Sequence, residues 1–171
     1  TLEEMSVGTV AVMGAGSWGT AFSVLCHATG EQVALWARDA GLAERMATSR
    51  RNDAYLPEAV LPDGLRVSAD PAEVLDGADL VVLAVPSVGL AAQLGVWGEL
   101  IPHDSTLASL TKGLDADGGR FASRVVIDAL DCDPDRVVAV SGPNLAGEIA
   151  QGRPSATVAA CPDLGRAQRV Q

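Results

Sequence analysis

Short apolar runs alternate with longer amphipathic stretches along this chain, and the two patterns predict different elements. Seven runs rich in Val, Ala and Leu have the length and composition of β-strands. They are TVAVMG (from Thr9), QVALWA (from Gln32), LRVSA (from Leu65), ADLVVLAV (from Ala78), STLASL (from Ser105), RVVAVS (from Arg136) and SATVAA (from Ser155). The stretch LVVLAV is apolar at every position, which is typical of a central parallel strand covered by helices on both faces.

The stretches between these runs have helical periodicity. Ala21, Val24, Leu25 and Ala28 follow the i, i+3, i+4, i+7 rule of an amphipathic helix, and Gly30 is placed to end that helix as its C′ residue. This alternation of strands and helices predicts an α/β fold, a Rossmann-like doubly wound and mostly parallel sheet with helices on both faces. Further helices are predicted over residues 40–48, 71–76, 87–97, 119–130 and 144–151.

Two segments do not follow the alternation. Residues 51–64, RNDAYLPEAVLPDG, contain two prolines and no hydrophobic period, so they are predicted to form a long loop. The last stretch, from Pro162, has the pattern of the first turns of a helix, and we expect the chain to be part of a longer protein.

The composition favours one ordinary globular domain over residues 1–171. A formal net charge of −10 argues against a nucleic-acid partner, because phosphate contacts need a basic surface. The charge does not argue against a nucleotide cofactor, since helix termini and one or two local cations can hold one.

Other features exclude further classes of protein and site. Three scattered cysteines without a CxxC pair favour reduced thiols. His27 and His103 are far apart, and DADGG (from Asp115) lacks the third acid and closing glutamate of a calcium loop, so no metal site is predicted. No apolar run is long enough for a membrane span, and TLEEMS at the start lacks the pattern of a secretory signal. We therefore expect a cytoplasmic protein without a membrane partner.

A glycine motif follows the first predicted strand and opens the first predicted helix. Gly14, Gly16 and Gly19 have the GxGxxG spacing of a dinucleotide-binding turn. Gly14 permits the tight turn, Gly16 lets the backbone approach a pyrophosphate, and Gly19 lets helix and strand pack closely. The helix start would then face the phosphates with free N–H groups and the positive end of its dipole.

The second predicted strand ends in WARD, where a fold selective for NAD usually has an acid. Arg38 stands there instead, and its guanidinium can bind a 2′-phosphate through two hydrogen bonds. This favours NADP, or the use of both cofactors, over strict selection of NAD. The alternative is that Arg38 is solvated at the start of the next helix, with Asp39 as its N-cap.

Six motifs occur in a fixed order along the chain. They are GAGSWGTAF (from Gly14), LWARD (from Leu35), NDAYLP (from Asn52), LAVPS (from Leu83), SLTKGL (from Ser109) and SGPNLAGEIAQGRPSATVAA (from Ser141). Their order and spacing resemble those of bacterial NAD(P)-dependent sn-glycerol-3-phosphate dehydrogenases. The likeness extends over nearly the whole chain, and its specific parts are TKG and SGPN-x-A-x-E. It implies that Ser17, Trp18, Arg38 and Tyr55 bind the cofactor, although Trp18 could instead be a core residue and Tyr55 a packing residue.

The same resemblance places further residues around cofactor and substrate. Lys112, the single lysine of the chain, would contact both cofactor and substrate. Gly142 and Asn144 would contact the substrate, with Asn144 also suited to be the N-cap of the next helix, while Ala146 would contact the cofactor. Pro86, at the end of the central strand, is placed near the nicotinamide.

The implied activity is the interconversion of sn-glycerol 3-phosphate and dihydroxyacetone phosphate with NAD(P)(H), which supplies glycerophospholipid synthesis. No catalytic residue is assigned here, because the family's proton-acceptor lysine belongs to a helical C-terminal domain expected beyond Gln171. The whole protein is expected to be a homodimer, and these residues alone to be inactive. The alternatives are a stand-alone dinucleotide-binding or sensing module, and a related two-domain reductase of the β-hydroxyacid or ketopantoate type.

Overall fold

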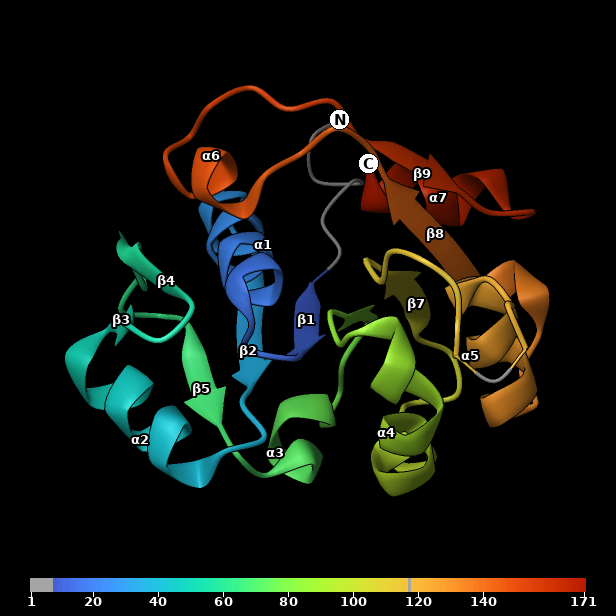
Figure 1. Ribbon diagram of the computed structural model, residues 1–171, viewed down its shortest axis with the longest axis horizontal. Coiled ribbons are helices and arrows are strands. Elements are labelled where there is room, and N and C mark those ends of the chain that lie inside the picture. Colours follow the sequence, from blue (N-terminus) through green and yellow to red (C-terminus); the bar gives the residue numbers. More distant parts are fainter. Residues whose placement is uncertain (1–7, 117) are drawn as a thin grey trace.

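The computed structural model describes residues 8–116 and 118–171, and its centre is a seven-stranded sheet (Figure 1). The strands lie in the order β5-β2-β1-β6-β7-β8-β9, and all neighbours are parallel except β9, which is antiparallel to β8. The predicted α/β, mostly parallel fold is confirmed. The strands of this sheet are β1 (Thr9–Met13), β2 (Gln32–Trp36), β5 (Arg66–Ser68), β6 (Leu80–Leu83), β7 (Thr106–Ser109), β8 (Val137–Ser141) and β9 (Val158–Ala160).

Helices cover both faces of the sheet, as predicted. The helices α3, α4 and α5 contribute to one apolar cluster, while α1, α2 and α7 pack against the other. The helix α6 lies beside α1 (Figure 1). The helices are α1 (Ser17–Ala28), α2 (Ala40–Ser49), α3 (Pro71–Leu75), α4 (Leu90–Trp97), α5 (Ala122–Leu130), α6 (Ala146–Ala150) and α7 (Leu164–Val170), with short 3₁₀ turns η2 (Ser87–Gly89), η3 (Gly98–Leu100) and η4 (Pro134–Arg136).

The two cores follow from the period of two along the strands. In β1, Val10 and Val12 belong to one cluster, whereas Ala11 and Met13 belong to the other. All four are fully buried, with 0% exposure. The four residues of β6 are divided between the clusters in the same way. A strand that is apolar at every position is therefore required here, because neither face meets water.

Residues 51–64, predicted as a loop, contain two strands, so that prediction was wrong. The strands β3 (Arg51–Asn52) and β4 (Leu56–Val60) form a separate antiparallel pair with a register shift. The pair is short, irregular and contains Pro57, so it has no readable alternation. Leu56 and Ala59 are instead buried against α1 and residues of α6. Contacts distant in sequence hold this hairpin in place.

The helix boundaries differ from their predicted positions by a few residues. The helix α5 begins at Ala122 rather than at residue 119, because Phe121 is paired in a bridge with Leu114. The first helix ends as predicted, with Gly30 at φ +97° immediately after the C-cap Thr29. No helix in the described ranges is long and apolar enough to cross a membrane. The segment TLEEMS, used in predicting that there is no secretory signal, lies outside the described residues.

Candidate functional site

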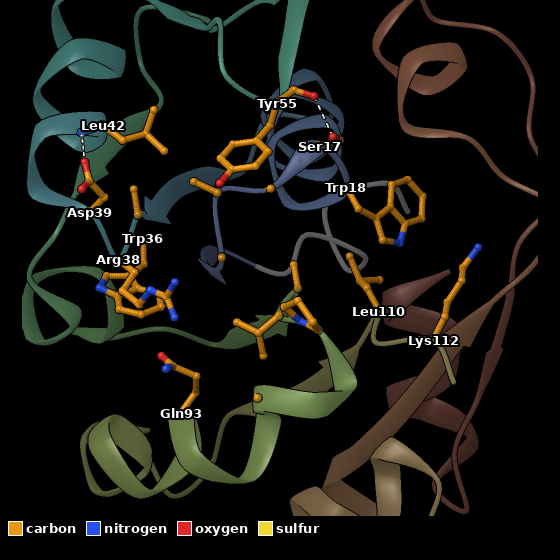
Figure 2. Close-up of a pocket in the computed structure, with 18 residues that line it drawn as sticks. Ser17, Trp18, Trp36, Arg38, Asp39, Leu42, Tyr55, Gln93, Leu110 and Lys112 are labelled. Atoms are coloured by element: carbon orange, nitrogen blue, oxygen red, sulfur yellow. Dashed lines mark hydrogen bonds between the residues drawn. The ribbon is translucent and has the colours of Figure 1, made fainter. Parts of the chain in front are cut away.

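A cavity of about 670 Å³ lies at the carboxyl edge of the sheet, where β1, β2, β6 and β7 end (Figure 2). Its size is within the range of small-molecule and cofactor sites. One end lies between Arg38 and Gln93, and the other lies by Trp18 and Lys112. Open α/β folds bind their ligands at this edge. The carboxyl ends of parallel strands thus bring together residues that are far apart in the sequence.

Gly14 and Gly16 of the glycine motif line this cavity and Gly19 does not, and the three glycines have different roles. Gly14 has φ +125°, and a Cβ there would lie 2.7 Å from the carbonyl oxygen of Ala84. A Cβ on Gly19 would lie 1.9 Å from the carbonyl oxygen of Gly14. A Cβ on Gly16 would meet nothing within 4 Å. Gly14 and Gly19 are therefore required by the turn itself, whereas Gly16 keeps the surface open toward the cavity.

The helix α1 begins directly at this turn. Its N-cap is Gly16, which makes no side-chain cap, and its first turn contains no acidic residue. The first N–H groups of a helix have no partner within the helix. With the dipole, such an end attracts negative charge, so the start of α1 is suited to hold a phosphate.

Trp18 is the second residue of α1, Tyr55 lies beside the start of this helix, and both line the cavity (Figure 2). Ser17 Oγ donates a hydrogen bond of 2.6 Å to the carbonyl oxygen of Tyr55, which joins the β3–β4 hairpin to the helix. Trp18 packs edge-on against Phe22, with ring centroids 6.3 Å apart, and also lines the cavity. The buried Trp18 Nε1 has no hydrogen-bond acceptor in the described part of the chain. Trp18 thus has both a packing contact and an unused donor at the site.

Arg38 and Asp39 differ in what their side chains contact. Asp39 Oδ1 accepts a 2.6 Å hydrogen bond from the N–H of Leu42, so Asp39 is the N-cap of α2, as the sequence suggested. Arg38 is exposed, lines the cavity and makes no side-chain hydrogen bond or ion pair within residues 8–116 and 118–171. The guanidinium is therefore available to an anionic ligand, whereas the Asp39 carboxylate is already used.

Lys112 occupies the other end of the cavity. Its Nζ donates to the carbonyl oxygen of Gly142 at 3.2 Å and to Asn144 Oδ1 at 2.9 Å. The ammonium also lies 5.8 Å from the centre of the Trp18 ring. All of these partners are uncharged, so the local positive charge is not neutralised by them. This arrangement favours an anionic group next to Lys112.

Asn144 is not the N-cap of α6, and that interpretation was wrong. The N-cap is Leu145, which makes no side-chain cap. The amide of Asn144, which is only 7% exposed, instead accepts from Lys112 and donates to Thr157 Oγ1 at 3.3 Å. The close approach of β7, β8 and β9 brings these three side chains together, and their hydrogen bonds use both the oxygen and the nitrogen of the amide.

The predicted site residues differ in whether they line the cavity. Pro86 lines it directly, as do Gly14, Gly16, Ser17, Trp18, Arg38, Tyr55 and Lys112. Gly142 and Asn144 are connected to it through Lys112. Ala146 is the first residue of α6 and packs against the small cluster of Ala21, Leu56 and Ala59. The structure thus brings most of the predicted residues to one site and leaves Ala146 beside it.

Several lining residues were not predicted from the sequence. Leu42, Gln93 and Leu110 all line the cavity. Gln93 is a single polar residue in the otherwise apolar helix α4, and such a helix has no apolar stripe that shows which face is buried. Within the described ranges, no three His, Cys, Asp or Glu side chains are grouped so that they could hold a metal ion. Asp117 of the DADGG segment lies outside these ranges.

The cysteines are free, and Cys26 on α1 is the most perturbed. Burial, and secondarily the charge of Glu31, raises the pKa of this thiol from 9.0 to about 12. The folded state therefore binds the thiol proton more tightly than the unfolded state between these two pKa values. The stability that depends on this thiol is fully present below the unfolded pKa and is lost as the pH rises toward the folded pKa.

We therefore expect a Cys26→Ala variant to lose less stability with rising pH than the unchanged chain. The difference should grow by about 1.4 kcal/mol per pH unit above the unfolded pKa. Urea unfolding at about pH 8 and about pH 10 measures it, because m-values and midpoints give the free energy of unfolding at each pH. Parallel pH dependences of the two proteins would contradict the prediction. Burial raises the pKa of the Cys161 thiol as well, but this thiol is less buried, so a Cys161→Ala variant should show a smaller difference than Cys26→Ala.

The chain is similar to known proteins over almost its whole length. Residues 9–167 match the family model described as "NAD-dependent glycerol-3-phosphate dehydrogenase N-terminus". A glycerol-3-phosphate dehydrogenase [NAD(P)+] of Mycobacterium leprae is 50% identical over 169 residues, which cover 97% of this chain and 48% of that protein. The protein of the same name from Corynebacterium glutamicum is 47% identical over 163 residues, covering 95% and 49%.

A solved structure is also similar to this chain. A glycerol-3-phosphate dehydrogenase from Coxiella burnetii superimposes with a TM-score of 0.88 at 31% identity, covering 95% of this chain and 49% of that chain. The chain spans about half the length of the curated relatives it matches. The similarity to all of these proteins therefore concerns one half of each.

Proposed function

The chain belongs to the family of NAD-dependent glycerol-3-phosphate dehydrogenase N-terminal domains, and on this premise we propose that it binds NADP(H) or NAD(H) in the pocket at the carboxyl edge of its sheet. The observation that carries the proposal is the uncapped start of α1 beneath the open surface of Gly16. The unpartnered Nε1 of Trp18 is a second group that fits a bound dinucleotide.

The pocket suggests how the dinucleotide would be held. The pyrophosphate would lie on the N–H groups at the start of α1, over Gly16. The 2′-phosphate of NADP(H) would bind Arg38, whose guanidinium has no partner among the residues with described positions. The nicotinamide half would then extend toward Pro86 and Lys112. Tyr55 and Ala146 would border the site, and Trp18 would cover it.

The proposed reaction is the interconversion of sn-glycerol 3-phosphate and dihydroxyacetone phosphate. When bound, the nicotinamide supplies the hydride donor or acceptor for C2 of this substrate. Lys112, held by Gly142 and Asn144, would bind the anionic substrate, because its neighbours leave its charge uncompensated. The group that exchanges the hydroxyl proton is proposed to lie in a helical domain outside these residues, since relatives are about twice as long.

This proposal is favoured over the other two interpretations. A β-hydroxyacid or ketopantoate-type reductase would share the fold, but the family match over residues 9–167 points to the glycerol-3-phosphate dehydrogenases. A stand-alone sensing module would bind the dinucleotide equally well. That interpretation would be favoured if a longer protein containing these residues had no dehydrogenase activity. The homodimer expected for the whole protein stays a prediction.

Titration of this chain with NADPH and with NADH, followed by quenching of tryptophan fluorescence, tests the proposal. We expect saturable binding of both, with NADPH bound more tightly. The Arg38→Ala variant should lose about ten- to a hundredfold in affinity for NADPH, because hydrogen bonds to a charged group contribute about 1.5–3 kcal/mol. Its affinity for NADH, which lacks the 2′-phosphate, should change by less than about threefold.

The matched control is Arg169→Ala, which removes an exposed arginine on α7 outside the pocket. This variant should bind both dinucleotides as the unchanged chain does. Absence of saturable binding at millimolar concentrations would overturn the proposed function. An equal loss for NADPH and NADH in Arg38→Ala would overturn the role of Arg38 in recognising the 2′-phosphate.

A further inference from the structure

One end of the pocket contains two polar side chains that have no partner in the described part of the chain. Arg38 follows β2, and Gln93 comes from α4 on the opposite wall (Figure 2). Gln93 is half-buried and makes no hydrogen bond to any residue in the described ranges. The amide is not among the buried polar groups left without a partner, so water reaches it and a ligand can replace that water.

The cavity that Gln93 lines is mainly apolar. Trp36, Leu42, Val85 and Gly89 line the same cavity. The indole N–H of Trp36 is already used, since it donates 2.9 Å to the carbonyl oxygen of Ala69. Apolar walls with one free amide suit a flat heterocycle whose edge has both a donor and an acceptor.

The orientation of the dinucleotide decides which of its parts meets this amide, and this step rests on the proposed function. With the pyrophosphate at Gly16 and the nicotinamide toward Lys112, the adenosine half extends to the opposite end. That end contains Arg38 and Gln93. The base attached to the ribose at Arg38 would therefore enter the space beside α4.

We propose that Gln93 recognises adenine, as an additional cofactor-binding residue and a determinant of base specificity. Its Oε1 accepts a hydrogen bond from the adenine N6 amino group, and its Nε2 donates one to N7. A glutamine amide matches this edge of adenine with two hydrogen bonds. Hypoxanthine has an oxygen in place of the amino group, so it has two acceptors on this edge and loses one of the two bonds.

The test compares NADPH with its deaminated analogue, reduced nicotinamide hypoxanthine dinucleotide phosphate, by fluorescence titration of the 171-residue chain. The unchanged chain should bind NADPH about three- to tenfold more tightly, as expected for one hydrogen bond. Gln93→Leu should bind the two ligands within about 1.5-fold of each other. Gln93→Glu, which can accept from N6 but cannot donate to N7, should bind both ligands more weakly and keep the preference for NADPH.

Two controls separate recognition from a general change in the protein. Gln168→Leu alters an exposed glutamine on α7 and should keep the full preference for NADPH. Circular dichroism and thermal unfolding show whether each variant is folded, and Gln93→Met, which also lacks the amide donor and acceptor, replaces Gln93→Leu if that protein does not fold.

The outcomes distinguish this inference from the proposed function. If the unchanged chain binds both ligands equally, or Gln93→Leu still prefers NADPH by the same factor, Gln93 does not recognise the adenine base. The binding of NADPH itself would then still support the proposed function. If neither ligand binds at millimolar concentration, both the proposed function and the role of Gln93 are wrong.

Discussion

Replacing Gly19 with alanine is expected to destabilise this domain by roughly 3 kcal/mol or more, because a methyl group cannot fit between helix and turn. The new Cβ would lie 1.9 Å from the Gly14 carbonyl oxygen and 3.0 Å from the Cβ of Ala84. The first of these atoms belongs to the backbone and cannot move aside by rotation. This clash can be removed only if α1 shifts away from β1, and that shift opens the apolar cluster on that face of the sheet. Chemical unfolding followed by circular dichroism measures the loss.

Gly16→Ala is the matched control for Gly19→Ala. Its Cβ would meet nothing within 4 Å, and Gly16 has an extended backbone that alanine also adopts. We expect it to lower the free energy of unfolding by about 1 kcal/mol or less, because alanine is a much poorer N-cap than glycine but its methyl group meets no other atom. Its methyl group would stand where the pyrophosphate is proposed to lie, so NADPH affinity should fall at least about tenfold. Equal destabilisation by the two variants would contradict the different roles of these glycines.

The second large effect is expected at Asn52, the buried polar residue that joins the β3–β4 hairpin to the glycine turn. Its side chain is fully buried, and Nδ2 donates to the Ala15 carbonyl oxygen at 2.9 Å and to Thr20 Oγ1 at 2.8 Å. Asn52→Ala removes both bonds and leaves a buried carbonyl without its donor. We expect a loss of about 3 kcal/mol in unfolding free energy, measured by urea unfolding.

Thr20→Val provides the comparison for Asn52→Ala. It removes one of the two hydrogen bonds but leaves Asn52 bonded to Ala15. The loss should be about 1–2 kcal/mol, clearly smaller than that of Asn52→Ala. If Asn52→Ala were no more harmful than Thr20→Val, the bond to the Ala15 carbonyl would not be what secures the turn.

Local features of the sequence were sufficient for the sheet and for much of the site. The strand β6 was predicted because all of its positions are apolar, and the turn at Gly14 because glycine spacing follows from backbone sterics. Asp39 was suggested as an N-cap because capping involves residues only three apart, and its bond to Leu42 agrees with this. Interactions over a few residues leave a pattern that can be read directly.

The hairpin and the polar groups joined to it could not be predicted in this way. The strand pair β3–β4 is placed by Leu56, Ala59 and Asn52, which contact α1 and the turn before it. Residues 51–64 include neither α1 nor the turn before it, so their sequence alone predicts a loop. The contact between Ser17 and Tyr55 spans 38 residues and exists only because this hairpin folds back onto α1.

The sequence by itself determined the fold class, the turn at the start of α1 and the family resemblance, because these depend on spacing within short segments. Tertiary structure alone decided the use of those polar side chains whose partners lie far away in the sequence. Asn144 looked like an N-cap, but the adjacency of β7 and β8 places it against Lys112, 32 residues away. Gln93 had no sequence signal, since only the packing of α4 on the sheet shows which of its faces meets the pocket. Side-chain partners across strands depend on strand order, which no local pattern encodes.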